Sequence, residues 1–175
     1  RVANSAAYNS GAPYGLLEDA LARVGLSEVY RFTGFAAVAE LSDRSLPFYG
    51  VSSAQLRENS LFSGLVMEAL ARRAKIDSRA AYTAGLLRST GKIALDRLTR
   101  DRVYGASYVS RGRGPLADWE TDVIGLGNCE AAAVILEDWH FPGKIVAAIR
   151  DHYLPGPESS ALASLLNLAA GAAAD

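Results

Sequence analysis

The side chains best suited to nucleophilic chemistry are the single cysteine, Cys129, and the two histidines, His140 and His152. A thiol activated by an imidazole needs a third group that orients the base, and the spacing here identifies none. A lone cysteine near a helix start is more often a small buried residue. Histidines near helix ends more often pack against neighbours or interact with the helix dipole. We therefore expect no catalytic residue among the three.

The same two histidines raise the question of a metal site. They stand twelve residues apart and fall on different predicted helices. A catalytic metal centre needs three or more convergent ligands and an open position. The residues by themselves therefore favour a chain without a metal and without a cofactor. The carboxylates in the same stretch are Glu130, Glu137, Asp138 and Asp151.

Two glycine motifs resemble phosphate-binding loops only in part. Gly91-Lys92 lacks a glycine five positions before Gly91, where the chain has Leu86, and Ile93 follows in place of Ser or Thr. Gly125-Leu126-Gly127 lacks the third glycine of a dinucleotide fingerprint, and no predicted strand precedes it. Neither motif predicts a nucleotide site of the usual kind.

Composition excludes several classes of function. The chain has 175 residues with 18 Lys and Arg, 19 Asp and Glu and a net charge of −1, so we expect no nucleic-acid binding. No apolar run is long enough for a membrane span, and we expect no membrane association. One cysteine forms no intrachain disulfide, which favours a reducing, cytoplasmic compartment. The first residue is Arg1, and we interpret the sequence as a fragment of a longer one.

The elements that must position these residues are predicted to be helices throughout. Ala and Leu dominate, and alternating Val/Ile runs and hairpin turns are scarce. Predicted N-caps are Ser27, Ser52 or Ser53, Asp77 or Ser78, Asn128, and Ser159 or Ser160. The predicted helices cover residues 16–24, 28–41, 53–75, 77–98, 117–124, 128–139 and 142–153, with a last one after Ser160.

We predict one domain over residues 1–175, with a division into two helical lobes near 100–116 as the alternative organisation. Gly85 and Gly91 lie inside the predicted helix 77–98, where each lowers helix stability by up to about 1 kcal/mol. Their presence predicts that another backbone or a large side chain packs closely against this helix.

The order of several short motifs resembles the HDOD domain, the HD-related output domain of bacterial signalling proteins. The resemblance covers nearly the whole chain, from Val2 to about Gly171. Ala84 to Lys92 (Ala-Gly-Leu-Leu-Arg-Ser-Thr-Gly-Lys) is similar to the family's Ala-Gly-Leu-Leu-His-Asp-Ile-Gly-Lys signature. The other similar segments are Asn4 to Tyr8, Leu17 to Gly25, Asn59-Ser60, Trp119 to Glu130, Trp139 to Pro142 and Ile149 to His152.

The resemblance implies an all-α, HD-like bundle with about two further helices before Val2. It also implies where catalytic HD proteins hold divalent metals through histidines and aspartates, and this chain departs from that pattern. Asn59 replaces one His, Arg88-Ser89 replaces the His-Asp pair, and Asn128 replaces a later His. The implied vestigial pocket comprises Asn59, Arg88, Ser89, Asn128, Asp151 and His152, and the preserved scaffold comprises Gly85, Gly91, Lys92, Trp139 and Pro142.

An Arg side chain puts a permanent positive charge where the family would hold a cation. Two unit charges about 4 Å apart repel by about 4 kcal/mol at an effective dielectric constant of 20. We therefore expect no metal and no enzymatic activity, and a regulatory module that acts by contact with a protein partner or a neighbouring signalling domain. One alternative is a sensor that holds a small anionic ligand, such as a nucleotide, in the vestigial pocket. The other is a phosphohydrolase with unusual metal ligands.

Overall fold

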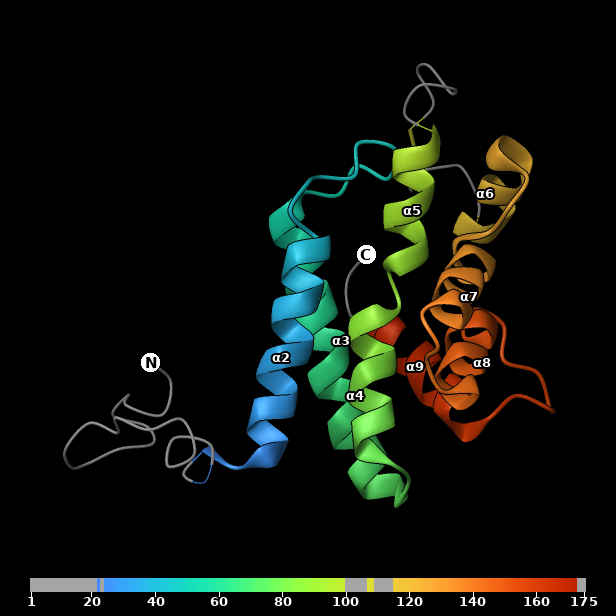
Figure 1. Ribbon diagram of the computed structural model, residues 1–175. Coiled ribbons are helices and arrows are strands. Elements are labelled where there is room, and N and C mark those ends of the chain that lie inside the picture. The colour runs from blue at the N-terminus through green and yellow to red at the C-terminus, as the bar shows by residue number, and fades with distance from the viewer. Residues whose placement is uncertain (1–21, 23, 100–106, 109–114, 173–175) are drawn as a thin grey trace. The chain divides into compact units, whose positions relative to one another are not determined.

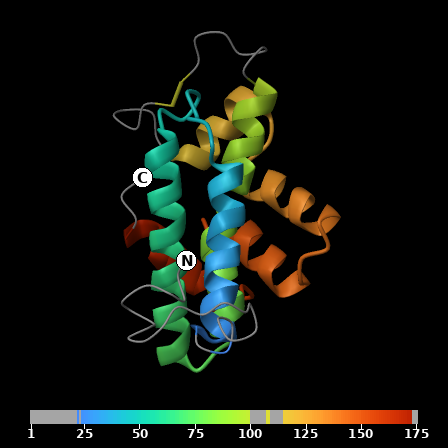
Figure 2. The ribbon, with the colours of Figure 1, turned by 60° about the vertical axis from the view of Figure 1, so that its left-hand side comes forward.

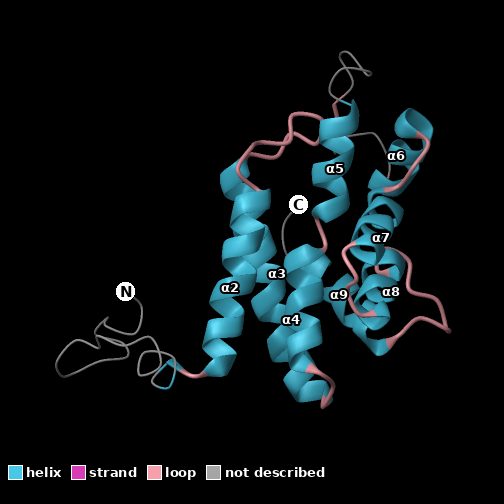
Figure 3. Cartoon of the chain, in the orientation of Figure 1, coloured by secondary structure: helices cyan, strands magenta, loops and turns pink. Residues whose placement is uncertain are grey.

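The computed structural model describes residues 22, 24–99, 107–108 and 115–172 (Figure 1). The chain divides into two compact units, residues 1–37 and residues 38–175, and each is described by itself. The described residues are helical apart from turns, loops and one isolated β-bridge between Leu46 and Val51 (Figure 3). The predicted all-α class is therefore confirmed for this part of the chain.

The helices keep the order expected from the sequence. The predicted helix 16–24 lies largely outside the described residues. The helices are α2 (Leu26–Leu41), α3 (Ser53–Ala74), α4 (Ser78–Leu87), α5 (Thr90–Thr99), α6 (Leu116–Ile124), α7 (Asn128–Asp138), α8 (Gly143–Asp151) and α9 (Ala161–Ala172).

Three predicted N-caps are confirmed by side-chain hydrogen bonds. The Ser52 hydroxyl accepts from the Gln55 backbone N–H at 3.2 Å, and Gln55 returns a bond to the Ser52 N–H, which completes a capping box. Asp77 accepts from the backbone N–H of Arg79 and Ala80 at the start of α4. The Ser160 hydroxyl accepts from Ala163 N–H at the start of α9. Each cap satisfies donors that the helix itself leaves unpaired.

Two predicted caps are wrong. The helix expected to begin after Ser27 starts at Leu26, so Ser27 lies inside α2. Asn128 is the first residue of α7, and Gly127 occupies the N-cap position. The Asn128 side chain instead bonds to a carboxylate on another helix, a non-local partner that sequence spacing does not reveal.

The predicted continuous helix 77–98 is also wrong, because it is broken at Arg88 and Ser89 into α4 and α5. Figure 1 shows the short unwound link between the two helices. The two halves pack against different neighbours, α4 against α3, α8 and α9, and α5 against α7. The break lets α4 and α5 pack in different directions, each against its own neighbours.

Gly85 and Gly91 mark these two close contacts, and the prediction drawn from them is confirmed. A Cβ atom added to Gly85 would lie 2.6–2.7 Å from the backbone of Ser63 and Gly64 on α3. A Cβ added to Gly91 would lie 1.8 Å from the Asn128 carbonyl oxygen on α7. At both positions two backbones meet with no room for a side chain.

Two apolar clusters hold the second unit together. The larger one joins α3, α4, α7, α8 and α9 around Met67, Leu136, Ile149 and Leu166, all of which are fully buried. The smaller one surrounds Trp119 and the loop before α3. In the view of Figure 2 the α7–α8 hairpin projects to the right of α4 and α5. None of the described helices combines the length and the apolar character that a membrane span requires.

The Gly91 contact yields a direct stability prediction. Gly91→Ala places a methyl group in steric clash with the Asn128 carbonyl oxygen, so α5 and α7 must separate. We expect a loss of about 3 kcal/mol of unfolding free energy, at the upper end of overpacking effects. Urea denaturation followed by circular dichroism measures it. The matched control is Gly143→Ala, because a Cβ there has no neighbour within 4 Å, and its stability should change little. Equal stability of the two variants would contradict the close crossing.

The cap of α4 predicts a pH dependence. Asp77 forms an ion pair with Lys144 of α8 at 2.5 Å, and this bond, with the cap bonds, lowers the pKa of Asp77 below 3.8. A lowered folded-state pKa means that the stabilisation is present above pH 3.8 and is lost as the pH falls through the folded-state value.

Asp77→Asn keeps a capping oxygen but loses the charge. We expect a cost of about 0.5 kcal/mol near neutral pH, the usual size for an exposed pair. The stability difference between wild type and variant should shrink as the pH is lowered toward 3, as measured by urea denaturation. A difference that stays constant over that range would show that the charge of Asp77 does not contribute.

Candidate functional site

Arg88 follows the last residue of α4 and is buried, with 2% of its surface exposed. Its guanidinium Nε donates a hydrogen bond of 2.9 Å to the hydroxyl of Ser63 on α3. Ser89 and Lys92 are buried nearby in the chain. A guanidinium does not lose its charge in a protein, so the α4–α5 link brings a permanent cation into the interior.

Asn128 and Glu120 form the central polar contact of the unit. Glu120 is fully buried on α6, and its carboxylate accepts from the Asn128 backbone N–H at 2.8 Å. The Asn128 side-chain amide donates to both carboxylate oxygens at 2.8 and 2.9 Å, and to the Tyr153 hydroxyl at 3.1 Å. Both amide protons of Asn128 are thereby directed at protein oxygens, so its NH2 group is fully engaged.

Tyr49, in the loop before α3, extends this contact. Its hydroxyl donates to Glu120 at 2.8 Å, and burial together with the Glu120 charge raises the pKa of Tyr49 well above its usual value. The Lys92 ammonium lies 6.0 Å from the centre of the Tyr49 ring. The network therefore joins the loop, α5, α6 and α7 through one buried carboxylate.

Cys129 and His152 are brought together, but not as a nucleophile and its base. The Cys129 sulfur lies 3.6 Å from His152 Nδ1, and the same Nδ1 lies 2.7 Å from the Ile149 carbonyl oxygen. A carbonyl only accepts, so Nδ1 carries a proton and does not take one from the thiol. Burial and the Glu120 charge also raise the pKa of Cys129 to about 12. The thiol is therefore not activated.

His140 lies apart from these residues and is exposed. It has a left-handed backbone with φ of 59°, and its Nδ1 lies 2.7 Å from the Asp138 carbonyl oxygen. It ends α7 as a turn residue, in keeping with the structural interpretation of the sequence.

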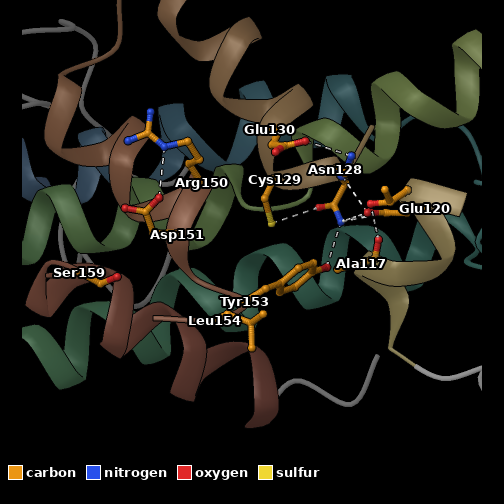
Figure 4. Close-up of a pocket in the computed structure, with 12 residues that line it drawn as sticks. Ala117, Glu120, Asn128, Cys129, Glu130, Arg150, Asp151, Tyr153, Leu154 and Ser159 are labelled. Carbon is orange, nitrogen blue, oxygen red and sulfur yellow. Dashed lines mark hydrogen bonds and ion pairs between the residues drawn. The ribbon is translucent and has the colours of Figure 1, made fainter. Parts of the chain in front are cut away.

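A cavity of about 520 Å³ opens beside the Asn128–Glu120 contact (Figure 4). It lies among α6, the start of α7, the end of α8 and the loop after α8. Arg150 and Asp151 form an ion pair of 3.1 Å at the cavity and are partly exposed. The lining residues are Ala117, Glu120, Thr121, Gly127, Asn128, Cys129, Glu130, Arg150, Asp151, Tyr153, Leu154 and Ser159.

Two of the six residues assigned to the vestigial pocket, Asn128 and Asp151, line this cavity. Asn59, Arg88, Ser89 and His152 are not among its lining residues, although His152 contacts the lining residue Cys129 at 3.6 Å. Sequence reasoning missed Glu120 and Tyr49 as members of the buried network. The available signal for Glu120 was its place in the segment Trp119 to Glu130 that resembles the family, whereas its burial on α6 beside Trp119 is visible only in the structure.

The scaffold residues differ in their surroundings. Gly85, Gly91 and Lys92 are buried at the α4–α5 link, whereas Trp139 is 45% exposed. Pro142 provides the N-cap of α8, one position before the predicted first turn. Trp139 therefore contributes less to packing than the sequence suggested.

The residues present do not fit a divalent metal ion. In the described parts of the chain, no three His, Cys, Asp or Glu side chains come close enough to share one. The buried Arg88 guanidinium is a cation and has no lone pair to offer a metal ion. We derive no metal-dependent step for this site.

The fold and the site define a class of all-helical bundle with a buried polar centre at the crossing of α5 and α7. The family model described as the HDOD domain matches residues 1–155, and the chain belongs to the HDOD domain family. No curated protein matches the chain in sequence at a significant level.

Solved structures share this fold. An HDOD domain protein of unknown function from Geobacter sulfurreducens has a TM-score of 0.69 and 18% identity, over 98% of this chain and 58% of its own. A candidate phosphohydrolase from Shewanella amazonensis has a TM-score of 0.70 and 24% identity, over 93% and 60%. The response regulator MmoQ (a fragment) from Methylococcus capsulatus has a TM-score of 0.54 and 22% identity, over 95% and 67%. The chain thus spans 58% and 60% of the first two relatives.

The Asn128–Glu120 contact predicts that a negative charge at position 128 lowers the unfolding free energy, and that removing the charge of Glu120 restores it. Asn128→Asp puts a second carboxylate against buried Glu120, and we expect a loss of about 3 kcal/mol of unfolding free energy. Adding Glu120→Gln restores an amide–carboxylate pair with the roles exchanged, so the double variant should regain a large part of the loss.

A double-mutant cycle measured by urea denaturation gives the coupling between the two positions. Asn167→Asp is the control, because Asn167 donates to the His152 carbonyl and not to a carboxylate. Its effect on unfolding free energy should add to that of Glu120→Gln without coupling. Additive effects of Asn128→Asp and Glu120→Gln would contradict a direct bond.

Proposed function

We propose that this chain is a non-catalytic regulatory module of bacterial signal transduction that works in the cytoplasm through contacts with protein partners. Membership of the HDOD family supports a role in signalling. One structural relative is a response regulator, which is consistent with that role. Another is a candidate phosphohydrolase, so hydrolysis is the function against which the proposal must be tested.

The observation that carries the proposal is the buried guanidinium of Arg88. By resemblance, Arg88-Ser89 stands where catalytic HD proteins have an adjacent His-Asp pair. In the folded chain Arg88 is 2% exposed and bonds to Ser63. A cation held in the interior repels a divalent ion and contributes no lone pair to it. Loss of ligands and added repulsion act in the same direction.

The second support is that the polar groups near the implied site are engaged with one another. Asn128, in a position of a lost His, donates to Glu120 and Tyr153. The Arg150–Asp151 ion pair engages the acidic group next to His152. A fold of the family's shape whose polar side chains bond to one another is suited to binding a protein partner and not to catalysis.

A small-molecule sensor is the second candidate, and the cavity of about 520 Å³ favours it. Arg150 is the cationic residue of that lining that would contact an anion, and the carboxylates Glu120, Glu130 and Asp151 line the same cavity. The earlier hypothesis that Arg88, Ser89 and Asn59 hold the anion has no support from the cavity, because they are not among its lining residues.

Hydrolysis of bis(p-nitrophenyl) phosphate with added Mn²⁺ tests the proposal, because this ester needs only a metal-activated nucleophile. We expect a rate equal to the buffer rate for wild type, and the same for Arg88→Ala. A wild-type rate above background that falls in Asp151→Ala and His152→Ala would contradict a non-catalytic module.

A thermal-shift series with nucleotides on the same preparation tests the sensor alternative. If the chain is a sensor, nucleotide raises the Tm of the wild type and leaves the Tm of Arg150→Ala unchanged.

A further inference from the structure

The helix α3 has an inverted pattern of polarity over residues 61–70. The only polar side chains in this stretch, Ser63 and Glu68, lie on the buried side. The opposite side presents Phe62 and Leu65, each 45% exposed, and Ala69. A surface helix normally turns its polar residues outward, and a helix that is apolar on every side is a covered one.

The exposed residues form a continuous stripe along the helix. Steps of four and three residues along α3 place side chains on one face, and the exposed positions follow those steps. Half-buried Leu61 and Val66 border the stripe and widen it. We call this face the α3 stripe, and its members are Glu58, Phe62, Leu65, Ala69, Arg72 and Arg73.

The charges of the α3 stripe stand at its two ends and have opposite signs. Glu58 lies seven residues before Leu65, and Arg72 lies seven residues after it. Two copies of this helix placed antiparallel, with Leu65 at the centre, therefore put each Glu58 beside Arg72 and Arg73 of the other copy. The same superposition puts Phe62 of one copy level with position 68 of the other, next to Ala69, so a large side chain meets a small one.

We propose that the α3 stripe is the interface of a homodimer with a two-fold axis near Leu65. An isologous interface needs a patch that complements itself, and the stripe has this property in both charge and apolar character. Leu168, another large apolar side chain with high exposure, has no charged residue before or after it on α9. The inference does not depend on whether the module is catalytic.

Figure 2 shows α3 lengthwise at the left side of the second unit. Its largest helix–helix contacts within this unit are with α4 and α9, through the face that carries Ser63, Gly64 and Met67. From Glu58 to Arg73 the helix extends about 23 Å at 1.5 Å per residue, which gives a partner helix four turns to pack against.

Sedimentation velocity on the full chain over a range of concentrations tests the proposal. We expect a dimer in wild type. For Leu65→Glu we expect a dimer dissociation constant at least tenfold higher, with an unchanged circular dichroism spectrum. Leu98→Glu, at a 68% exposed position on α5, is the matched control and should remain dimeric. A monomer at all concentrations, or a dimer that Leu65→Glu leaves intact, would overturn the proposal.

A cross-link tests the position of the axis. A cysteine on a two-fold axis faces its own copy, so Leu65→Cys in a Cys129→Ser background should give a disulfide-linked dimer under mild oxidation. Leu98→Cys in the same background should not. Cys129 is the one native cysteine, so the pattern has a single interpretation. Equal cross-linking of both variants would show random collision and overturn the axis at Leu65.

A charge exchange provides the third readout. Glu58→Arg should weaken the dimer, and adding Arg73→Glu should strengthen it again, because the opposed signs are restored across the axis. Arg73 is preferred over Arg72, since Arg72 also bonds to Glu68 within the helix at 2.7 Å. If the double variant is weaker than the single one, the antiparallel arrangement is wrong. Either result leaves the phosphodiester assay, and hence the proposed function, unaffected.

Discussion

The crossing of α5 and α7 at Gly91 is the contact on which the rest of the second unit depends. Because Gly91 has no side chain, the Asn128 carbonyl approaches the α5 backbone directly. That approach fixes the start of α7, and with it the amide of Asn128 against the Glu120 carboxylate. Tyr49 and Tyr153 then bond to the same pair. One missing side chain thus sets the geometry of the polar centre.

This centre is costly unless every buried charge has a partner, since an uncompensated ion in the interior loses several kcal/mol of solvation. Glu120 meets the requirement with an amide, a backbone N–H and a phenol, and Arg88 bonds to the Ser63 hydroxyl. Groups that satisfy one another in this way stabilise the fold, which agrees with the non-catalytic role proposed above. The cavity beside them is partly open to solvent, and the buried side chains of Glu120 and Asn128 that line it already bond to each other.

Local features of the fold were predictable from the sequence, and contacts between distant residues were not. Ser52, Asp77 and Ser160 act on donors two or three residues away, so their caps follow from spacing. Gly85 and Gly91 predicted close packing but not the partner. The break at Arg88 and the bond from Asn128 to Glu120 depend on which helices become neighbours. The resemblance named Asn128 and Arg88, yet it could not say that α6 would supply the carboxylate.

We propose that hydrogen-bonded protein groups have taken the place of metal ligands in this HDOD chain. Elemental analysis by inductively coupled plasma mass spectrometry, on protein purified without chelators and dialysed against metal-free buffer, measures this most directly. We expect well below one Mn, Fe, Ni or Zn ion per chain, with or without prior incubation in each metal. One tightly held ion per chain that is lost in Asp151→Ala and His152→Ala would contradict it.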